Sequence, residues 1–289
     1  MTPLPIWVHE WFVAPTAFGL AALHARRALG TGRATLEMLS LALYGFALEW
    51  AAIVVFHSHD YGSGWRVAVR GVPVAVALAW AAVIVSALSL AARLGLASAA
   101  ARAAGAALIG ITLDLLMEPV AVQAGFWRWT PPGPWLSVPV GNFVGWGVIL
   151  GVYVSAADTW AGERGALREA ARRIGLAALS ILALLAVGTL WRSLGVEGLF
   201  ASGRAWFAWA GFLLAALGLV WYRSDAGVAG SLGQRLGAAA GRLPVAALAL
   251  LAWTFALDAV ALDEPRLMAV AFGSVVTLTL IAWTAGRPA

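Results

Sequence analysis

Asp114 and Glu118 lie four residues apart in TLDLLMEPVA (112–121), a segment that is otherwise apolar. At this spacing two side chains share one face of a helix, with β-carbons about 6 Å apart. Two carboxyl groups this close in a low dielectric do not both ionise, so one keeps its proton near neutral pH and the pair titrates as a unit. A retained proton in a dry site is what a general acid requires. The competing interpretation is structural: the pair bridges to an arginine or caps a neighbouring helix.

The composition indicates that this segment lies in a membrane. Of the 289 residues, 62% are hydrophobic and only 11% are charged, which is typical of membrane proteins. Apolar runs of about 20 residues, each long enough to cross a bilayer, lie at 6–25, 35–57, 72–94, 104–124, 139–159, 174–194, 205–222, 243–262 and 266–285. We therefore expect an all-α fold: a polytopic membrane helix bundle of about eight or nine transmembrane helices, forming a single integral membrane domain over 1–289. Pro119, which lacks an N–H, predicts a kink directly after the acidic pair.

The basic residues predict how the bundle is oriented. All 19 of them are arginine, and 13 fall in the loops after the odd-numbered spans. By the positive-inside rule these loops are cytoplasmic and the N-terminus is outside. The positive charge is therefore interpreted as a membrane-orientation signal, and no nucleic-acid partner is expected.

Missing residue types narrow the chemistry further. Without lysine no Schiff base to retinal or pyridoxal phosphate can form, and without cysteine there are no disulfides, iron–sulfur clusters or thiol nucleophiles. Four histidines are too few for the clustered motifs of membrane di-iron oxygenases. The sequence has no dinucleotide fingerprint and no P-loop. What remains is acid–base chemistry on an apolar substrate, with no metal, nucleotide or covalent cofactor.

Two stretches of the chain resemble each other. VPVAVALAW (72–80) and VPVGNFVGW (138–146) share Val-Pro-Val and a tryptophan in register, and each follows a carboxylate within a span, Glu49 or Glu118. We interpret residues 35–94 and 104–159 as two copies of a helix–loop–helix unit, followed by C-terminal spans over 174–285. Both copies run in the same direction, so a site at their interface is expected. Chance similarity in a low-complexity sequence is the alternative.

Most other polar residues of the spans fall near the membrane face opposite the arginine-rich one. They are His9, Glu10, Glu49, His57, His59, Asp60, Asn142 and Asp258. Polar groups that converge within a bilayer usually face a cavity or one another. Glu49 is a catalytic candidate, although it could serve packing alone, and Asn142 could simply cap a helix.

Histidines and tryptophans complete the candidate site. His57 and His59 form an H-x-H pattern that could bind metal, but no further histidine cluster supports it, so no metal site is expected. Most of the 16 tryptophans are expected to be interfacial anchors. Trp127, Trp129 and Trp146 lie beside the second carboxylate unit and could line a cavity.

These motifs together resemble a known family. The run MEPVAVQAGFWRW followed by VPVGNFVGW resembles the carotenoid biosynthesis family that contains the carotenoid 1,2-hydratases and the bisanhydrobacterioruberin hydratases. The signature is Glu-Pro in a membrane helix, then Gly-x-Trp-x-Trp, then Val-Pro-x-x-Asn-Phe-x-Gly-Trp. The combination is fairly specific and covers roughly residues 45–160.

The resemblance implies a hydro-lyase that adds water across the terminal C1=C2 bond of an acyclic carotenoid, giving a tertiary alcohol. Its partners would be the apolar carotenoid, water, membrane lipid and other enzymes of the pathway, in the cell membrane of a bacterium or archaeon, with no cofactor. Roles then follow for the candidates: Asp114 or Glu118 protonates C2, Glu49 or Asp60 activates water, and Trp127, Trp129 or Trp146 flanks the C1 cation. Substrate contacts are expected from His57, His59 and Asn142.

Two other functions stay open at this point. A lycopene end-group cyclase shares the first protonation and the cation, and exclusion of water decides its product. A proton-coupled transporter or a non-catalytic carotenoid-binding protein would also suit a repeat with intramembrane carboxylates.

Overall fold

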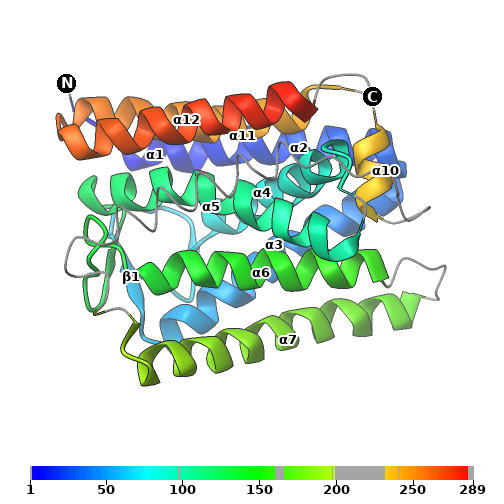
Figure 1. Ribbon diagram of the computed structural model, residues 1–289, viewed down its shortest axis with the longest axis horizontal. Helices are drawn as coiled ribbons and strands as arrows, with labels where there is room; N and C mark the ends of the chain where they lie inside the picture. The colour runs from blue at the N-terminus through cyan, green and yellow to red at the C-terminus, as the bar shows by residue number, and fades with distance from the viewer. Residues whose placement is uncertain are drawn as a thin grey trace.

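The computed structural model describes residues 2–96, 98–159, 166–196, 198, 232–239 and 241–285. It is a bundle of long helices with small strands at one end (Figure 1). The first span is one continuous helix made of α1 (Ile6–Val8), the π-helical turn η1 (His9–Val13) and α2 (Ala14–Leu29). The other helices are α3 (Thr31–Val54), α4 (Val74–Arg93), α5 (Ala99–Gln123), α6 (Val140–Thr159), α7 (Ala166–Ser193), α10 (Leu232–Ala238), α11 (Leu243–Ala261) and α12 (Pro265–Ala285).

The helices agree with the predicted spans. Among the described residues, seven helices are long and apolar enough to cross a membrane, and Val140–Ala156 of α6 is a shorter apolar stretch. The predicted span 205–222 lies outside the described residues. The protein is therefore an all-α integral membrane protein, while its orientation in the membrane stays a prediction.

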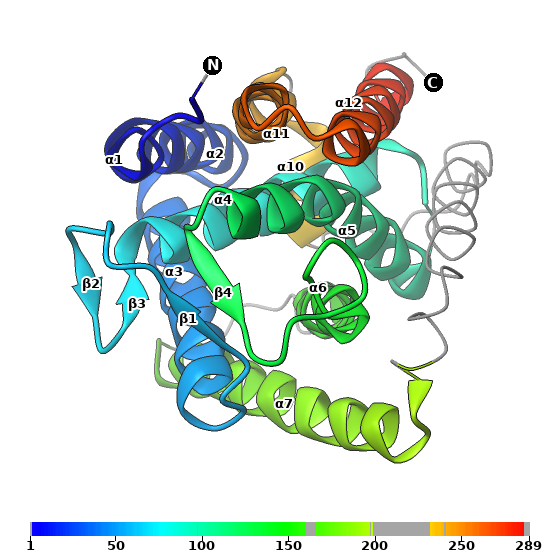
Figure 2. The same cartoon turned by 90° about the vertical axis from the view of Figure 1, so that its left-hand side faces the viewer.

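Helices α4 and α5 form the centre of the bundle. In each, 78% of the most apolar stretch is buried inside the protein, against 11% for α7. The sequence of α4 is apolar on every face, as expected for a helix with neighbours all round. Helices α2, α11 and α12 pack on one side of this centre, and α3, α6 and α7 lie on the other (Figures 1 and 2).

The loops of the two repeat units pair with each other, which the sequence did not predict. Strand β1 (His59–Tyr61) follows α3, strand β4 (Trp127–Trp129) follows α5, and the two run antiparallel across one end of the bundle (Figure 2). Asp60 pairs with Arg128 at the centre, so His59 lies opposite Trp129 and Tyr61 opposite Trp127. This β1–β4 ribbon joins the loops of the two predicted repeat units, and the duplication itself stays a prediction. A second small hairpin joins β2 (Ala68–Val69) to β3 (Val72–Pro73).

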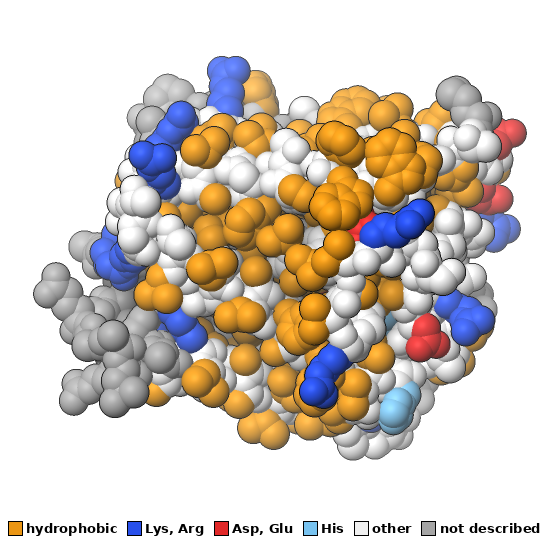
Figure 3. Space-filling model, turned by 180° about the vertical axis from the view of Figure 1, so that it is seen from behind, with side chains coloured by type: hydrophobic (Ala, Val, Ile, Leu, Met, Phe, Trp, Pro, Cys, Tyr) orange, Lys and Arg blue, Asp and Glu red, His pale blue; other side chains and the backbone are white. Residues whose placement is uncertain are grey.

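Acidic side chains gather toward one end of the bundle. Figure 3 shows a broad hydrophobic face whose visible acidic side chains lie toward one end, while arginines are seen at both ends. The ribbon end carries the carboxyl termini of α3, α5 and α11 and the amino termini of η1, α4 and α6. Alternating helix direction thus brings the polar residues of different spans to one end, as the span layout predicted.

Candidate active site

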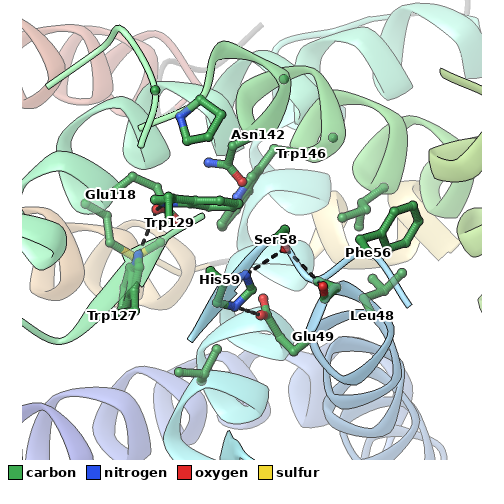
Figure 4. Close-up of a pocket in the computed structure, with 18 of the residues that line it drawn as sticks. Leu48, Glu49, Phe56, Ser58, His59, Glu118, Trp127, Trp129, Asn142 and Trp146 are labelled. Atoms are coloured by element: carbon green, nitrogen blue, oxygen red, sulfur yellow. Dashed lines mark hydrogen bonds and ion pairs between the residues drawn. The ribbon is translucent and has the colours of Figure 1, made fainter. Parts of the chain in front are cut away.

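A cavity of about 700 Å³ opens beneath the ribbon, between α3, α4, α5, α6 and α7. Most of its wall is apolar or aromatic, and a small set of polar side chains gathers near the ribbon (Figure 4). These are His9, Glu49, Ser58, His59, Tyr61, Glu118, Thr130, Asn142 and Arg192. A large apolar pocket with a few convergent polar groups is the usual form of a small-molecule site.

Glu118 projects from α5 into this cavity and is held by the strand that follows its helix. The indole N–H groups of Trp127 and Trp129 both donate to its Oε2, each at 2.8 Å. Alternate residues of a strand point to the same side, so β4 presents both indoles to one carboxyl group. The donors occupy one oxygen only, and Oε1 is left to the cavity. We call Glu118, Trp127 and Trp129 the Glu118 centre.

Glu49 on α3 has the same relation to β1, with different partners. Its Oε2 accepts from the Tyr61 hydroxyl at 2.8 Å and contacts His59 Nε2 at 3.2 Å. Its Oε1 accepts from the indole N–H of Trp80 at 2.7 Å. Gly45 makes this reach possible, because a β-carbon there would collide with the Trp80 side chain. We call Glu49, His59, Tyr61 and Trp80 the Glu49 centre.

Hydrogen bonding assigns a positive charge to His59. The Ser58 hydroxyl has a single proton and donates it to the carbonyl of Ala52 at 3.0 Å, so it must accept from His59 Nδ1 at 3.0 Å. Nε2 faces the Glu49 carboxylate, which makes both ring nitrogens donors. Burial opposes the charged form, but the hydrogen bond and negative charge of Glu49 outweigh it and raise the pKa of His59. Burial and the Glu49 charge also raise the pKa of Tyr61 well above 10, so its phenol stays a donor.

Asp114 is buried behind the cavity wall and does not line it. Its Oδ2 accepts from the amide of Asn142 at 2.9 Å, and Asn142 itself lines the cavity from the start of α6. Asp114 and Glu118 therefore have separate partners, and Asp114 positions Asn142. Helix α5 continues past Pro119 to Gln123, and the kink at Pro119 stays a prediction.

The tryptophans that matched in the two repeat units meet across the cavity. The rings of Trp80 and Trp146 stack with centroids 4.1 Å apart and planes 25° apart, and both line the cavity. The His59 ring packs against Trp129, with centroids 5.0 Å apart. A chain of contacts, Glu49–His59–Trp129–Glu118, thus joins the two carboxyl groups (Figure 4).

Two sequence candidates lie outside this arrangement. Asp60 points away from the cavity because it is the middle residue of β1, and its side chain is 66% exposed beside Arg128 at 3.8 Å. Helix α3 ends at Val54 rather than at 57, so His57 falls in the following turn, where it is exposed. Neither residue lines the cavity.

Sequence reasoning did not select Tyr61 or Trp80 as site residues. Trp80 carried a usable signal, since it matched Trp146 in the repeat. Tyr61 is two residues from His59 and would have been found if HDY had been interpreted as a strand. His9 and Asp258 were placed only at the correct membrane face, and their contact with each other joins positions 249 residues apart.

The fold and the site together define a polytopic membrane protein with a carboxyl-bearing aromatic cavity at one end of the bundle. Residues 11–202, about two thirds of the chain, match the model of the family described as carotenoid biosynthesis protein. The chain belongs to this family, which gives it a role in carotenoid biosynthesis. Neither the curated proteins nor the solved structures gave a significant match.

Proposed function

We propose that the protein hydrates the terminal C1=C2 bond of an acyclic carotenoid end group. The observation that carries this proposal is the Glu118 centre: a carboxyl group in an aromatic cavity with both indole donors on one oxygen. A proton on this group resides on Oε1, because Oε2 already accepts two hydrogen bonds. The group is thus a fixed acid whose proton faces the cavity.

Hydration begins when Glu118 transfers this proton to C2 of the alkene. The new C–H bond forms from the π electrons, and the positive charge appears at C1, which is tertiary. The stacked pair Trp80 and Trp146 and the ring of Trp129 supply aromatic faces, each worth on the order of 0.5–2 kcal/mol to a nearby cation. Water then attacks C1 and loses a proton, which gives the tertiary alcohol.

The remaining polar groups act on the cation and on water. Glu49 is a fixed negative charge near the reacting end, and with three donors on its oxygens it is a poor acceptor for another proton. Asn142 donates to Asp114, which leaves its carbonyl oxygen to hold a water molecule. Asp60 has no part in this proposal.

Polar groups next to the acid favour hydration over cyclisation. A cyclase must keep water from the cation, whereas here His59, Ser58 and Asn142 line the same cavity as Glu118. The cavity also lies at the end of the bundle, where water can arrive while the polyene stays in the hydrocarbon.

Expression in a lycopene-producing host tests the proposal. A pigment heavier by one water supports hydration, an isomer of unchanged mass supports cyclisation, and unaltered lycopene supports transport or binding alone. Glu118→Gln is isosteric and still accepts the indole bonds through its carbonyl, but it has no acidic proton. Since general acids contribute about 10²–10⁴-fold, we expect hydrated pigment to fall by at least about 100-fold.

Glu264→Gln is the matched control, because Glu264 lies in the turn between α11 and α12. It should hydrate lycopene as the unmodified protein does. Full activity in Glu118→Gln would remove Glu118 from the role of proton donor.

A further inference from the structure

Hydration also needs a group that takes a proton from the attacking water. The reaction delivers one proton to C2 and releases one from water, so acceptance at water is as necessary as donation at carbon. Glu49 is poorly placed for this because its oxygens are already occupied by Trp80, Tyr61 and His59. His59 is unsuitable while it is charged, since both of its ring nitrogens are donors.

A second histidine lines the same cavity from the first span. His9 is buried, with 4% of its surface exposed, and its Nε2 lies 2.9 Å from Oδ2 of Asp258 on α11. The other oxygen of Asp258 accepts the backbone N–H of Leu4 at 2.6 Å. Asp258 is itself fully buried, so this carboxylate has fixed partners and no solvent to reorganise.

The contact with Asp258 determines which nitrogen of neutral His9 carries the proton. A carboxylate that faces Nε2 requires Nε2 to be the donor, which leaves the lone pair on Nδ1. A carboxylate that orients an imidazole in this way also stabilises the imidazolium that forms when the ring accepts a proton. His9 thus has the tautomer of a general base, with the accepting nitrogen turned away from Asp258.

Two aromatic rings hold the His9 ring in place. It packs between Phe126 of the ribbon loop and Phe255 of α11, with ring centroids at 4.7 and 5.0 Å. Glu10, the next residue, binds the backbone N–H groups of Arg66 and Val67 instead. These two neighbours have different partners at the start of the π-helical turn η1, and π-helical turns recur at functional sites.

We infer that His9 is the general base that takes the proton from water in the proposed hydration, and that Asp258 is its positioning residue. Oxygen of water bonds to C1 as His9 Nδ1 accepts one of its protons, and the resulting imidazolium is paired with Asp258. The proton then returns to solvent, and Glu118 is reprotonated before the next turnover. Both residues lie outside the 11–202 segment that matches the family model, so the family match does not assign them.

This inference rests on the proposed function, and deuterium separates the two. Membranes containing the full-length protein are incubated with lycopene in D₂O. The hydrated product and the deuterium content of recovered lycopene are both measured by mass spectrometry. A cation that forms but is not captured by water loses a proton from C2 or from a methyl group, and so returns to the alkene carrying deuterium.

We expect His9→Gln and Asp258→Asn to lower hydration at least about 100-fold, the lower end for a general base, while recovered lycopene still gains deuterium. Glu118→Gln should abolish both signals, because no cation forms. Asp263→Asn, an exposed acid in the turn after α11, should hydrate lycopene normally. Protein amount and unfolding temperature in detergent are measured for each variant.

Two results would overturn the inference. Normal hydration by His9→Gln would show that His9 is not the general base. Loss of both hydration and deuteration in His9→Gln would indicate that His9 has a merely structural role. Lycopene left unchanged in mass and deuterium by the unmodified protein would instead overturn the proposed function, and the inference with it.

Discussion

The Glu49 centre and the Glu118 centre have the same plan and different chemistry. In both, a carboxyl group near the end of a helix is bound by alternate residues of the strand that follows. At Glu49 the strand supplies an imidazolium and a phenol, and at Glu118 it supplies two indoles. The first carboxylate therefore has a cation as partner, whereas the second has only neutral donors.

This difference fits two separate roles for the two carboxyl groups. An anion paired with a buried cation is held in its charged form, and removing either partner leaves an uncompensated charge. A carboxyl group that meets only neutral donors can hold a proton and release it to a substrate. On this view the Glu49 centre contributes charge and structure, and the Glu118 centre contributes the reactive proton. Four experiments test the comparison.

Neutralising Glu49 should mainly lower the stability of the protein, whereas neutralising Glu118 should mainly lower its activity. Glu49→Gln breaks a buried ion pair, which typically costs about 3–5 kcal/mol. Glu118→Gln leaves no buried cation without a partner, so its free energy of unfolding should change by about 1 kcal/mol, the scale of one hydrogen bond. Thermal and denaturant unfolding in detergent measures both. Equal destabilisation by the two substitutions would mean that the centres do not differ as proposed.

Removing one indole donor should act mainly on activity at Glu118. Trp129→Phe keeps an aromatic ring in the cavity but removes one of two hydrogen bonds to Oε2. A loss of about 1–2 kcal/mol in positioning corresponds to roughly a tenfold or larger fall in hydrated pigment. Trp253→Phe, an exposed tryptophan on α11, is the control. Unchanged pigment in Trp129→Phe would show that the indole bond does not orient the acid.

Stability should fall as pH rises, because of His59. Its pKa is raised in the folded protein, chiefly by Glu49 against the effect of burial. A group whose pKa is raised by folding stabilises the protein fully at any pH below its unfolded pKa, which is about 6.5 for histidine. This contribution is lost as the pH rises through the folded pKa. We expect the unfolding temperature to decline as pH rises above about 6.5, and the decline to be smaller in His59→Gln. Identical pH profiles would contradict the ion pair.

The smallest effect is expected at the centre of the ribbon. Asp60 and Arg128 are exposed and 3.8 Å apart, and surface pairs contribute about 0–1 kcal/mol. Asp60→Asn should therefore change the amount of hydrated pigment by less than about twofold. Its free energy of unfolding should change by no more than about 0.4 kcal/mol, the free energy equivalent of a factor of two. A strong loss of hydrated pigment would return Asp60 to the reaction as an activator of water.

Much of the fold could be predicted because a bilayer imposes its rules locally. A span needs about 20 apolar residues wherever it occurs, so hydropathy placed every described span close to its observed bounds. Val74–Arg93, for instance, agrees with the predicted 72–94. The β1–β4 ribbon was missed because each strand has only three residues, and pairing joins segments 68 residues apart. Such short strands have no periodicity that a sequence pattern can detect.

The candidate site could likewise be predicted where it depends on residues close in sequence, but not where it depends on strand register or helix packing. Trp127 and Trp129 follow Glu118 closely, so the chain itself keeps them near it, and the sequence selected all three. Pairing of β1 with β4 turned His59 inward and Asp60 outward, a choice that hydropathy cannot make because it depends on register. Asp114 does not line the cavity. Helix α6 packs against α5, and Asn142 at the start of α6 binds the Asp114 carboxyl group.

The sequence by itself determined the membrane class, the helices, the polar end of the bundle and the family, since each depends on composition or on nearby residues. Tertiary structure alone decided which polar groups from different spans meet. It paired Glu49 with His59 and Trp80, turned Glu118 toward the cavity, and brought His9 to Asp258 from the other end of the chain. The physical reason is that buried polar groups are stable only with partners, and packing across the bundle decides which partners are within reach.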